Sequence, residues 1–172
     1  MQRHFLYLPF ALQIFGVMAI SMIVPSLYAL VTEQFFEARM FFYTGLLGVT
    51  FLALIGLARS NQISRETALD QMLSLALIFV FLPVFLAIPE YSVIRTTSFL
   101  NAYLDMVSAL TTTGFEVFPA SRLSDSLHLW RALVGWMGGA LIWVAAVAIL
   151  APLNLGGFEL TAQHANARRQ AN

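Results

Sequence analysis

The sequence predicts an all-α membrane protein, with two N-terminal transmembrane helices followed by one helix–pore loop–helix unit. Hydrophobic residues make up 59% of the 172 residues and charged residues only 10%, whereas soluble domains average about 45–50% apolar and about 25% charged residues. The apolar residues also gather into four segments of about 20 residues, the length that crosses a hydrocarbon core about 30 Å thick. Composition and segment length therefore both indicate a lipid environment.

Three of the apolar segments lie in the first half of the chain. The first spans residues 8–30. It is about twice as long as the apolar part of a signal peptide, which has about 7–15 residues, and no A-x-A-like cleavage site follows it, so we interpret it as a retained helix. The second segment spans residues 40–58, and the third spans residues 68–88. Pro89 is expected to end the third helix.

A short helix is predicted between the third segment and the last one. Its apolar residues recur at helical spacing on a single face, at Phe99, Tyr103, Met106, Val107 and Leu110. Thr97 or Ser98 is expected to cap it. A helix over residues 98–110 is only about 20 Å long and cannot cross the membrane. The last apolar segment, residues 127–152, is again long enough to cross.

These segments divide the chain into a transmembrane helix pair (residues 1–60), a helix–pore helix–filter–helix repeat (61–157) and a polar tail (158–172). Four crossings place both termini on the same side of the membrane. That side holds five arginines and the opposite side holds four. This small excess only just satisfies the positive-inside rule, by which arginine-rich loops are cytoplasmic. We therefore expect cytoplasmic termini and an opposite face that holds most of the acidic residues.

The composition excludes several kinds of site. The chain has no cysteine, which removes disulfides and cysteine-ligated metals. His4, His128 and His164 are far apart in the sequence, so a zinc site is not expected. No basic run occurs that could follow a nucleic-acid backbone, and we expect no nucleic-acid partner.

The stretch between the short helix and the last crossing segment is unusually polar and flexible for this chain. It reads TTTGF and consists of Thr111, Thr112, Thr113, Gly114 and Phe115. Irregular backbone at membrane depth must be buried in protein or line water. A loop that re-enters the membrane can point its carbonyl oxygens at a pore, where they replace the hydration shell of a monovalent cation. The partly negative C-terminal end of the preceding helix also favours a cation.

Two interpretations of this loop are open. A threonine-rich helix end followed by glycine is also an ordinary C-cap, because glycine adopts the left-handed conformation easily, and the motif alone is more typical of such a cap. Its position after a helix that is too short to cross, and between two that are long enough, favours an ion-binding filter.

Two charged residues near this loop are candidate supports. Asp105 is in the short helix, and an acid at membrane depth is a candidate functional residue. The simpler interpretation is that it pairs with Arg131 or with backbone donors behind the loop. Arg131 follows Trp130 near the start of the last helix, where both would anchor at the lipid interface. Support of the filter is the alternative role for Arg131.

The sequence FLNAYLDMVSALTTTGFEVF, residues 99–118, resembles the first pore loop of the Trk/Ktr/HKT superfamily of potassium transporters, particularly that of the TrkH-type membrane subunit. LWRALVGWMGG (residues 129–139) is similar to that family's helix after the first filter, and ISRETAL (residues 63–69) to the start of its first repeat. The resemblance implies a helix–pore loop–helix unit that is used four times around one pore. It assigns residues 111–115 to the filter and Asp105 to the acid of the pore helix.

This resemblance implies potassium transport across a bacterial inner membrane, with the chain as the N-terminal part of a TrkH-like uptake subunit. Potassium would be the transported ion, and we expect no enzymatic activity and no cofactor. The expected partners are the lipid membrane, three further pore repeats and a cytoplasmic nucleotide-binding regulatory subunit. The repeats would come from the same gene, a neighbouring gene or further copies in a homotetramer.

The sequence also departs from this family. It contains one filter loop where a pore of this kind takes four, and it lacks the interrupted helix that gates the family's pore. GGALIW, residues 138–143, replaces a more glycine-rich stretch. The alternative function is therefore that of a non-transporting membrane component, a truncated TrkH-like repeat that acts as an assembly or packing subunit of a larger complex.

Overall fold

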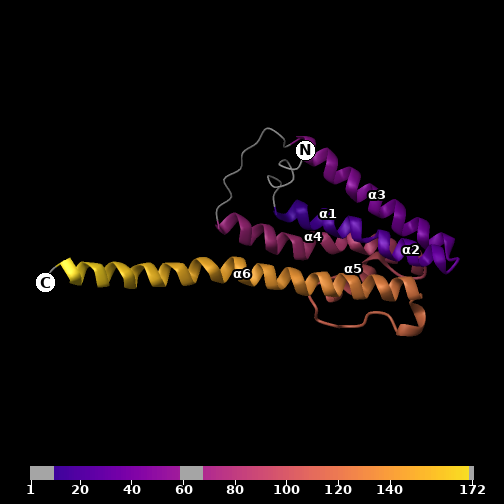
Figure 1. Ribbon diagram of the computed structural model, residues 1–172. Helices are drawn as coiled ribbons and strands as arrows, with labels where there is room; N and C mark the ends of the chain where they lie inside the picture. The colour runs from indigo at the N-terminus through magenta and orange to yellow at the C-terminus, as the bar shows by residue number, and fades with distance from the viewer. Residues whose placement is uncertain (1–9, 59–67, 171–172) are drawn as a thin grey trace. The chain divides into compact units, whose positions relative to one another are not determined.

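The computed structural model describes residues 10–58 and 68–170, and the side chains of residues 11–58 and 75–147. Within these ranges the chain forms helices joined by turns, with no β-strand. The helices are α1 (Phe10–Ser21), α2 (Ile23–Val31), α3 (Phe35–Ala58), α4 (Ala68–Ile94), α5 (Phe99–Leu110) and α6 (Asp125–Gln170), with a 3-10 turn at Ala120–Arg122 (Figure 1). The predicted boundary at residue 60 and most of the ISRETAL stretch lie outside the described residues.

Four helical segments are long and apolar enough to cross a membrane: Ala11–Val31, Phe35–Ala58, Leu75–Ile94 and Asp125–Val147. They confirm the predicted all-α membrane protein and its four crossing segments. α5 has only 12 residues and, at about 1.5 Å per residue, is too short to cross. It begins after Ser98, one of the two predicted caps, whose hydroxyl accepts a hydrogen bond from the Asn101 N–H at 3.3 Å.

The predicted end of the third segment at Pro89 is wrong, because α4 continues through Pro83 and Pro89 to Ile94. A proline removes a backbone N–H and loosens the preceding turn, and membrane helices tolerate it where other groups satisfy the backbone. The prolines leave the carbonyls four positions earlier, those of Phe79 and Phe85, without their usual helical donor. The next carbonyl in each of these turns accepts a side-chain hydrogen bond, Val80 O from Tyr103 Oη at 3.2 Å and Leu86 O from Trp130 Nε1 at 3.2 Å. These two bonds also tie α4 to α5 and α6.

The other helices extend beyond the apolar segments that predicted them. α3 begins at Phe35 rather than at residue 40, and α6 runs from Asp125 to Gln170, into the predicted polar tail. The first segment consists of two helices, α1 and α2, with a break at Met22. Hydropathy detects the part of a helix that lies in hydrocarbon, whereas polar residues continue the same helix into the interface.

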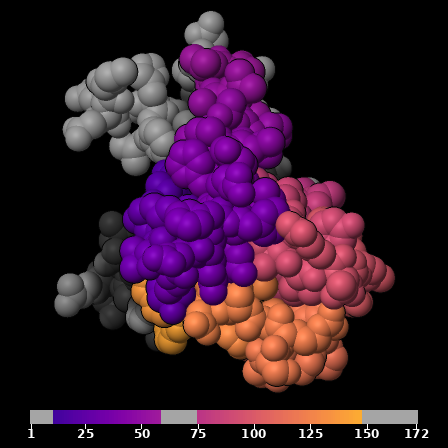
Figure 2. Space-filling model, turned by 90° about the vertical axis from the view of Figure 1, so that its right-hand side faces the viewer, coloured from indigo at the N-terminus to yellow at the C-terminus, as the bar shows by residue number. Residues whose placement is uncertain are grey.

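The chain divides into two compact units at Gly139. The first unit contains α1–α5 and the start of α6, and the second begins at Ala140 and contains the remainder of α6. Within the first unit, the violet α1–α3 lie beside the pink α4 (Figure 2); α1 and α3 pack against α4, and α4 packs against α5. The side-chain contacts that position the candidate site all lie in this first unit.

Glycine lets α3 pack closely against two neighbouring helices. A Cβ atom on Gly48 would lie 2.8 Å from the Cβ of Ala19 in α1 and 2.5 Å from the ring of Phe85 in α4. Small residues allow helices in membranes to approach this closely. Nearer the start of α3, the Phe41 ring is buried. Its centroid lies 5.8 Å from the centroid of the Trp130 ring in α6. α3 therefore joins the N-terminal helix pair to the helices that hold the candidate site.

A polar contact joins the start of α3 to the start of α6. The Glu37 carboxylate accepts hydrogen bonds from Ser124 Oγ at 2.6 Å and from Ser126 Oγ. Ser124 Oγ in turn accepts from the Leu127 N–H at 3.4 Å, at the N-terminus of α6. Glu37 therefore fixes the first turn of the helix that follows the TTTGF loop.

Glu37→Gln is expected to lower the free energy of unfolding by about 1 kcal/mol, because hydrogen bonds to a charged acceptor are about twice as strong as those to a neutral one. Thermal unfolding of the purified protein in detergent measures this effect. Glu33→Gln, which changes an exposed residue in the turn before α3, is the control and should leave the midpoint unchanged. An equal shift in both variants would contradict a specific role for Glu37.

Candidate filter site

α5 ends in a cap that leads directly into the filter loop, by which we mean residues 111–115. The Thr112 N–H donates a hydrogen bond to Ala109 O at 3.1 Å, and the Thr113 N–H donates to Ser108 O at 3.0 Å. This pair of hydrogen bonds is the Schellman arrangement, which satisfies the last carbonyls of a helix. The cap that one interpretation predicted is therefore present at the end of α5.

The residue in the left-handed position of this cap is threonine and not glycine. Thr112 has φ 56°, and Gly114, two residues later, has φ 74°. A β-branched residue rarely adopts a positive φ, and doing so costs of order 1–3 kcal/mol. An ordinary glycine cap would place glycine where Thr112 stands. The loop therefore departs from a simple cap and uses Gly114 for a second reversal of the backbone.

Four consecutive carbonyl oxygens of the filter loop accept no hydrogen bond from any described residue, those of Thr111, Thr112, Thr113 and Gly114. Residues 112–115 are exposed. The next carbonyl, that of Phe115, accepts from Ser108 Oγ at 2.8 Å, which closes the loop back onto α5. Backbone carbonyls are strong acceptors and rarely lack partners away from water. This row of oxygens is therefore free to contact water or an ion.

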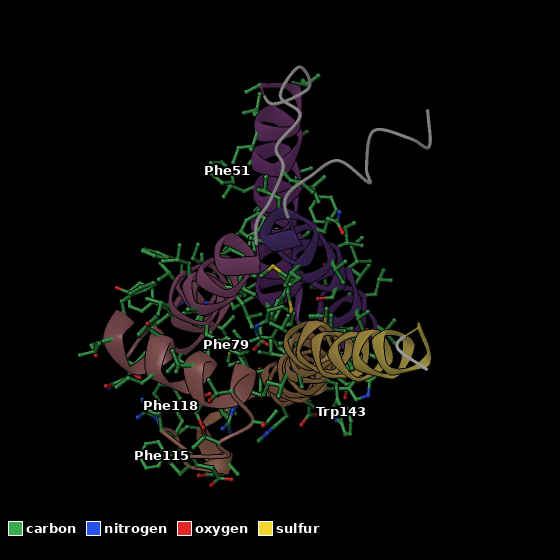
Figure 3. All side chains as sticks on the ribbon, turned by 90° about the vertical axis from the view of Figure 1, so that its left-hand side faces the viewer. Phe51, Phe79, Phe115, Phe118 and Trp143 are labelled. Carbon is green, nitrogen blue, oxygen red and sulfur yellow. The ribbon has the colours of Figure 1, made fainter. Side chains whose placement is uncertain are left out.

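Side chains of the loop brace it from one side and leave it open on the other. Thr111 Oγ1 donates to Val107 O at 2.8 Å and lies 2.7 Å from Thr113 Oγ1. The Phe115 side chain is 65% exposed, whereas Phe118, which follows the loop, is 3% exposed; both are labelled beside the end of α5 in Figure 3. The loop is thus anchored at both ends, and a Cβ atom added at Gly114 would meet no atom of the described residues within 4 Å.

Asp105 and Arg131, the two candidate supports of the loop, are in contact with each other. Arg131 Nε in α6 lies 2.7 Å from Asp105 Oδ2 in α5. Asp105 Oδ1 accepts a hydrogen bond from the Val117 N–H at 3.2 Å. The side chain of Asp105 is 0% exposed and that of Arg131 is 17% exposed. Asp105 therefore connects α5, α6 and the chain just after the loop, as the simpler interpretation of this acid expects.

α6 packs directly against the last turn of α5. A Cβ atom on Gly138 would overlap the Leu110 carbonyl oxygen and lie 2.8 Å from the carbonyl carbon. A Cβ atom on Gly135, one turn earlier, would lie 3.6 Å from Ala109 O. The backbone of α6 at Gly138 therefore sets the position of the residue that immediately precedes the filter loop.

Glu90 in α4 is a third ionisable residue, beside Asp105 and Arg131. The sequence did not predict it as part of the site. It is 0% exposed and interacts electrostatically with Asp105 and Arg131. Because Pro89 is expected to end the third helix, the sequence places Glu90 outside the membrane, on the face that holds most of the acidic residues. An acid directly after an apolar segment was the signal that could have drawn attention to it.

The structure brings the predicted site residues together in two groups. Thr111, Thr112, Thr113, Gly114 and Phe115 form one loop, and Asp105 and Arg131 lie against the chain that leaves it. Ion binding by these residues stays a prediction.

Three curated proteins are similar to parts of this chain. It is 41% identical over 83 residues to the Trk system potassium uptake protein TrkI of Halomonas elongata, which covers 48% of the chain. It is 41% identical over 61 residues to the Trk system potassium uptake protein TrkH of Vibrio parahaemolyticus, and 38% identical over 66 residues to the uncharacterized cation transporter MJ1485 of Methanocaldococcus jannaschii, covering 35% and 38% of the chain.

These similarities cover only 16%, 13% and 14% of the three relatives, so the matched stretch is a small part of their length. No family model and no solved structure matches the chain. The relatives are transporters by name and not enzymes. The chain is therefore similar, over 61 to 83 residues, to two proteins named as Trk system potassium uptake proteins and to one named as a cation transporter, and it has four helices long and apolar enough to cross a membrane.

Proposed function

We propose that this chain supplies one ion-selective filter loop to a pore that transports potassium, as part of a TrkH-like uptake subunit. One observation supports this role above the others: the four unpaired carbonyl oxygens of residues 111–114, in an exposed loop next to a helix too short to cross. Rows of backbone carbonyls replace the hydration shell of potassium in selective filters. The two relatives named as potassium uptake proteins support the same ion.

The surroundings of the loop suit a cation. α5 directs its C-terminal end at the loop, and the last carbonyls of a helix are equivalent to a negative charge of roughly one half. The positive φ of Thr112 and of Gly114 turns the backbone twice within three residues. Such strained backbone is found where the surrounding structure holds it for a function. Two hydrogen bonds support the loop in this way, one from the Val117 N–H to Asp105 and one from Ser108 Oγ to the Phe115 carbonyl.

One loop cannot surround an ion, so the function requires further pore repeats. Their source is the same polypeptide, a neighbouring gene product or further copies of this chain. The exposed aromatic side chains of Phe115 and Trp136, 65% and 75% exposed, fit contact with such repeats or with lipid. The proposal also places the chain in a bacterial inner membrane with both termini in the cytoplasm. Its proposed regulatory partner is a cytoplasmic nucleotide-binding subunit.

Gly114→Ser, introduced into the complete transporter that contains this chain, is expected to reduce the preference for potassium over sodium roughly tenfold. A Cβ atom on Gly114 meets no atom within 4 Å, so the effect would not come from a clash. It would come from the backbone, because φ 74° costs a residue with a side chain about 1–2 kcal/mol, which is close to a factor of ten. Uptake of both ions by cells that lack other potassium transporters measures this ratio.

Gly135→Ala is the control, because it adds the same Cβ atom at a site where it makes an ordinary contact. This variant should keep the selectivity of the unmodified protein. An unchanged ratio in Gly114→Ser at normal protein abundance would contradict the filter role. The chain would then be better explained as a packing or assembly subunit.

A further inference from the structure

The strongest unexplained group in the described part of the chain is the carboxyl group of Glu90. It lies in the membrane-crossing segment Leu75–Ile94 and is 0% exposed. Neither of its oxygens has a hydrogen-bond partner among the described residues. Buried polar groups are almost always hydrogen-bonded, and an isolated buried charge is far more costly than a neutral group. As an ionised carboxylate, Glu90 would therefore be buried with neither a hydrogen-bond donor nor an ion-pair partner of its own among the residues described.

Charge counting identifies what is missing. In the part of the chain that the structure describes, Arg131 is the cation that pairs with Asp105 and also interacts electrostatically with Glu90, so two ionised carboxylates would leave one negative charge in excess. Asp105 Oδ1 accepts a hydrogen bond from the Val117 N–H, and Oδ2 forms an ion pair with Arg131 Nε at 2.7 Å that is not aligned as a hydrogen bond. A carboxylate has about four acceptor sites, so Asp105 has acceptor sites left for a further hydrogen bond. A proton on Glu90 would supply that bond and remove the excess charge.

We propose that Glu90 is a positioning residue for the filter loop and that it holds Asp105 by donating a hydrogen bond from its own protonated carboxyl group. This proposal rests on the proposed filter role of residues 111–115. The proton comes from water during folding, and no bond other than the O–H bond forms. Glu90 acts through Asp105, which in turn holds the Val117 N–H behind the loop.

The scaffold around Glu90 is rigid enough for this role. One turn before Glu90, the Leu86 carbonyl accepts from Trp130 Nε1, and Trp130 is the neighbour of Arg131. At the other side of Asp105, Ser108 is one turn along α5 and binds the Phe115 carbonyl. Asp105 and Ser108 thus hold the chain on the exit side of the loop at two points. Releasing Asp105 would leave that exit held by Ser108 alone.

The test compares Glu90→Gln with Glu90→Met in the complete transporter. Glutamine is neutral and can donate an N–H to Asp105, whereas methionine has similar length and no donor. Normalised to protein abundance, Glu90→Gln should retain the potassium-over-sodium uptake ratio within about twofold. Glu90→Met should lower that ratio about tenfold, because Asp105 loses the hydrogen bond that positions it. Tyr91→Phe, on the neighbouring partly exposed residue, is the control and should match the unmodified protein.

Two results would overturn the proposal. A loss in Glu90→Gln as large as that in Glu90→Met would show that the charge of Glu90 matters, and an unchanged ratio in Glu90→Met would show that Glu90 does not position the loop. If the unmodified transporter and Gly114→Ser show the same ratio, the proposed filter role fails instead.

A second measurement does not depend on transport or on Glu90→Met folding. The infrared spectrum of the purified protein should contain the carbonyl-stretch band of a protonated carboxylic acid, and Glu90→Gln should remove it. Identical spectra of the two proteins in this region would overturn the proposed proton even if transport is selective.

Discussion

Gly138→Ala is expected to displace α6 from the end of α5 and to abolish ion uptake by the complete transporter. The added Cβ would overlap the Leu110 carbonyl oxygen and lie 2.8 Å from its carbon and 2.9 Å from its Cα. These are backbone atoms of the last turn before the filter loop, so they cannot move aside without moving the loop. Overpacking of this kind costs about 1–3 kcal/mol. Thermal unfolding in detergent and potassium uptake per amount of membrane protein measure the two effects.

Gly135→Ala is the matched control for this prediction. It is the same substitution on the same helix, so the gain in helix propensity is equal, about 1 kcal/mol. Its Cβ would lie 3.6 Å from Ala109 O, an ordinary van der Waals contact. We expect this variant to be at least as stable as the unmodified protein and to retain uptake. If both variants lose stability equally, contact between Gly138 and Leu110 is not the cause.

The crossing helices could be predicted from sequence because lipid imposes the same requirement on each of them, about 20 apolar residues. The ends of the helices depend on local contacts instead. Proline normally ends a helix, yet α4 continues through Pro83 and Pro89 while Tyr103 and Trp130 donate hydrogen bonds to its carbonyls. Tyr103 and Trp130 are remote in sequence from α4, so the residues around the prolines do not show that other helices hold this part of α4 in place.

The conformation of the filter loop was predicted less well than its position. Local propensity places glycine in the left-handed position of a cap, and TTTG therefore suggests Gly114 for that role. In the structure Thr112 occupies it. The loop is held by Ser108 at one point and by Asp105 at another, and the end of α5 is held against Gly138. Tertiary contacts of this kind override a conformational cost of about 1–3 kcal/mol.

The charged residues behind the loop show the same limit. Asp105 and Arg131 could be proposed as a pair, because both belong to elements that flank the loop. Glu90 was missed as a consequence of the expected helix end at Pro89, one residue earlier. Once α4 continues, Glu90 lies within a crossing segment and is fully buried. An error in one helix boundary thus removed a residue from the candidate site.

Arg131→Gln is expected to destabilise the protein by about 3–5 kcal/mol, the cost of removing one partner of a buried ion pair. Asp105 is 0% exposed, and Glu90 lies beside it, so the loss of Arg131 leaves buried acidic groups with no facing cation among the described residues. Protein abundance in the membrane and the unfolding midpoint should both fall. Arg122→Gln, at an exposed arginine that contacts Thr96 Oγ1 at 2.8 Å, is the matched control and should cost at most about 1 kcal/mol.

Asp105→Asn should be less damaging than Arg131→Gln, because Glu90 can release its proton and become the negative partner of Arg131 once residue 105 is neutral, and asparagine can still accept the Val117 N–H through its carbonyl oxygen. The double variant Arg131→Gln/Asp105→Asn should recover part of the stability lost in Arg131→Gln, since it removes the excess buried charge. Interaction energies of contacting residues in such cycles are about 0.5–3 kcal/mol. Effects that simply add in the double variant would show that the two side chains do not stabilise each other, and that packing alone holds α6 behind the loop.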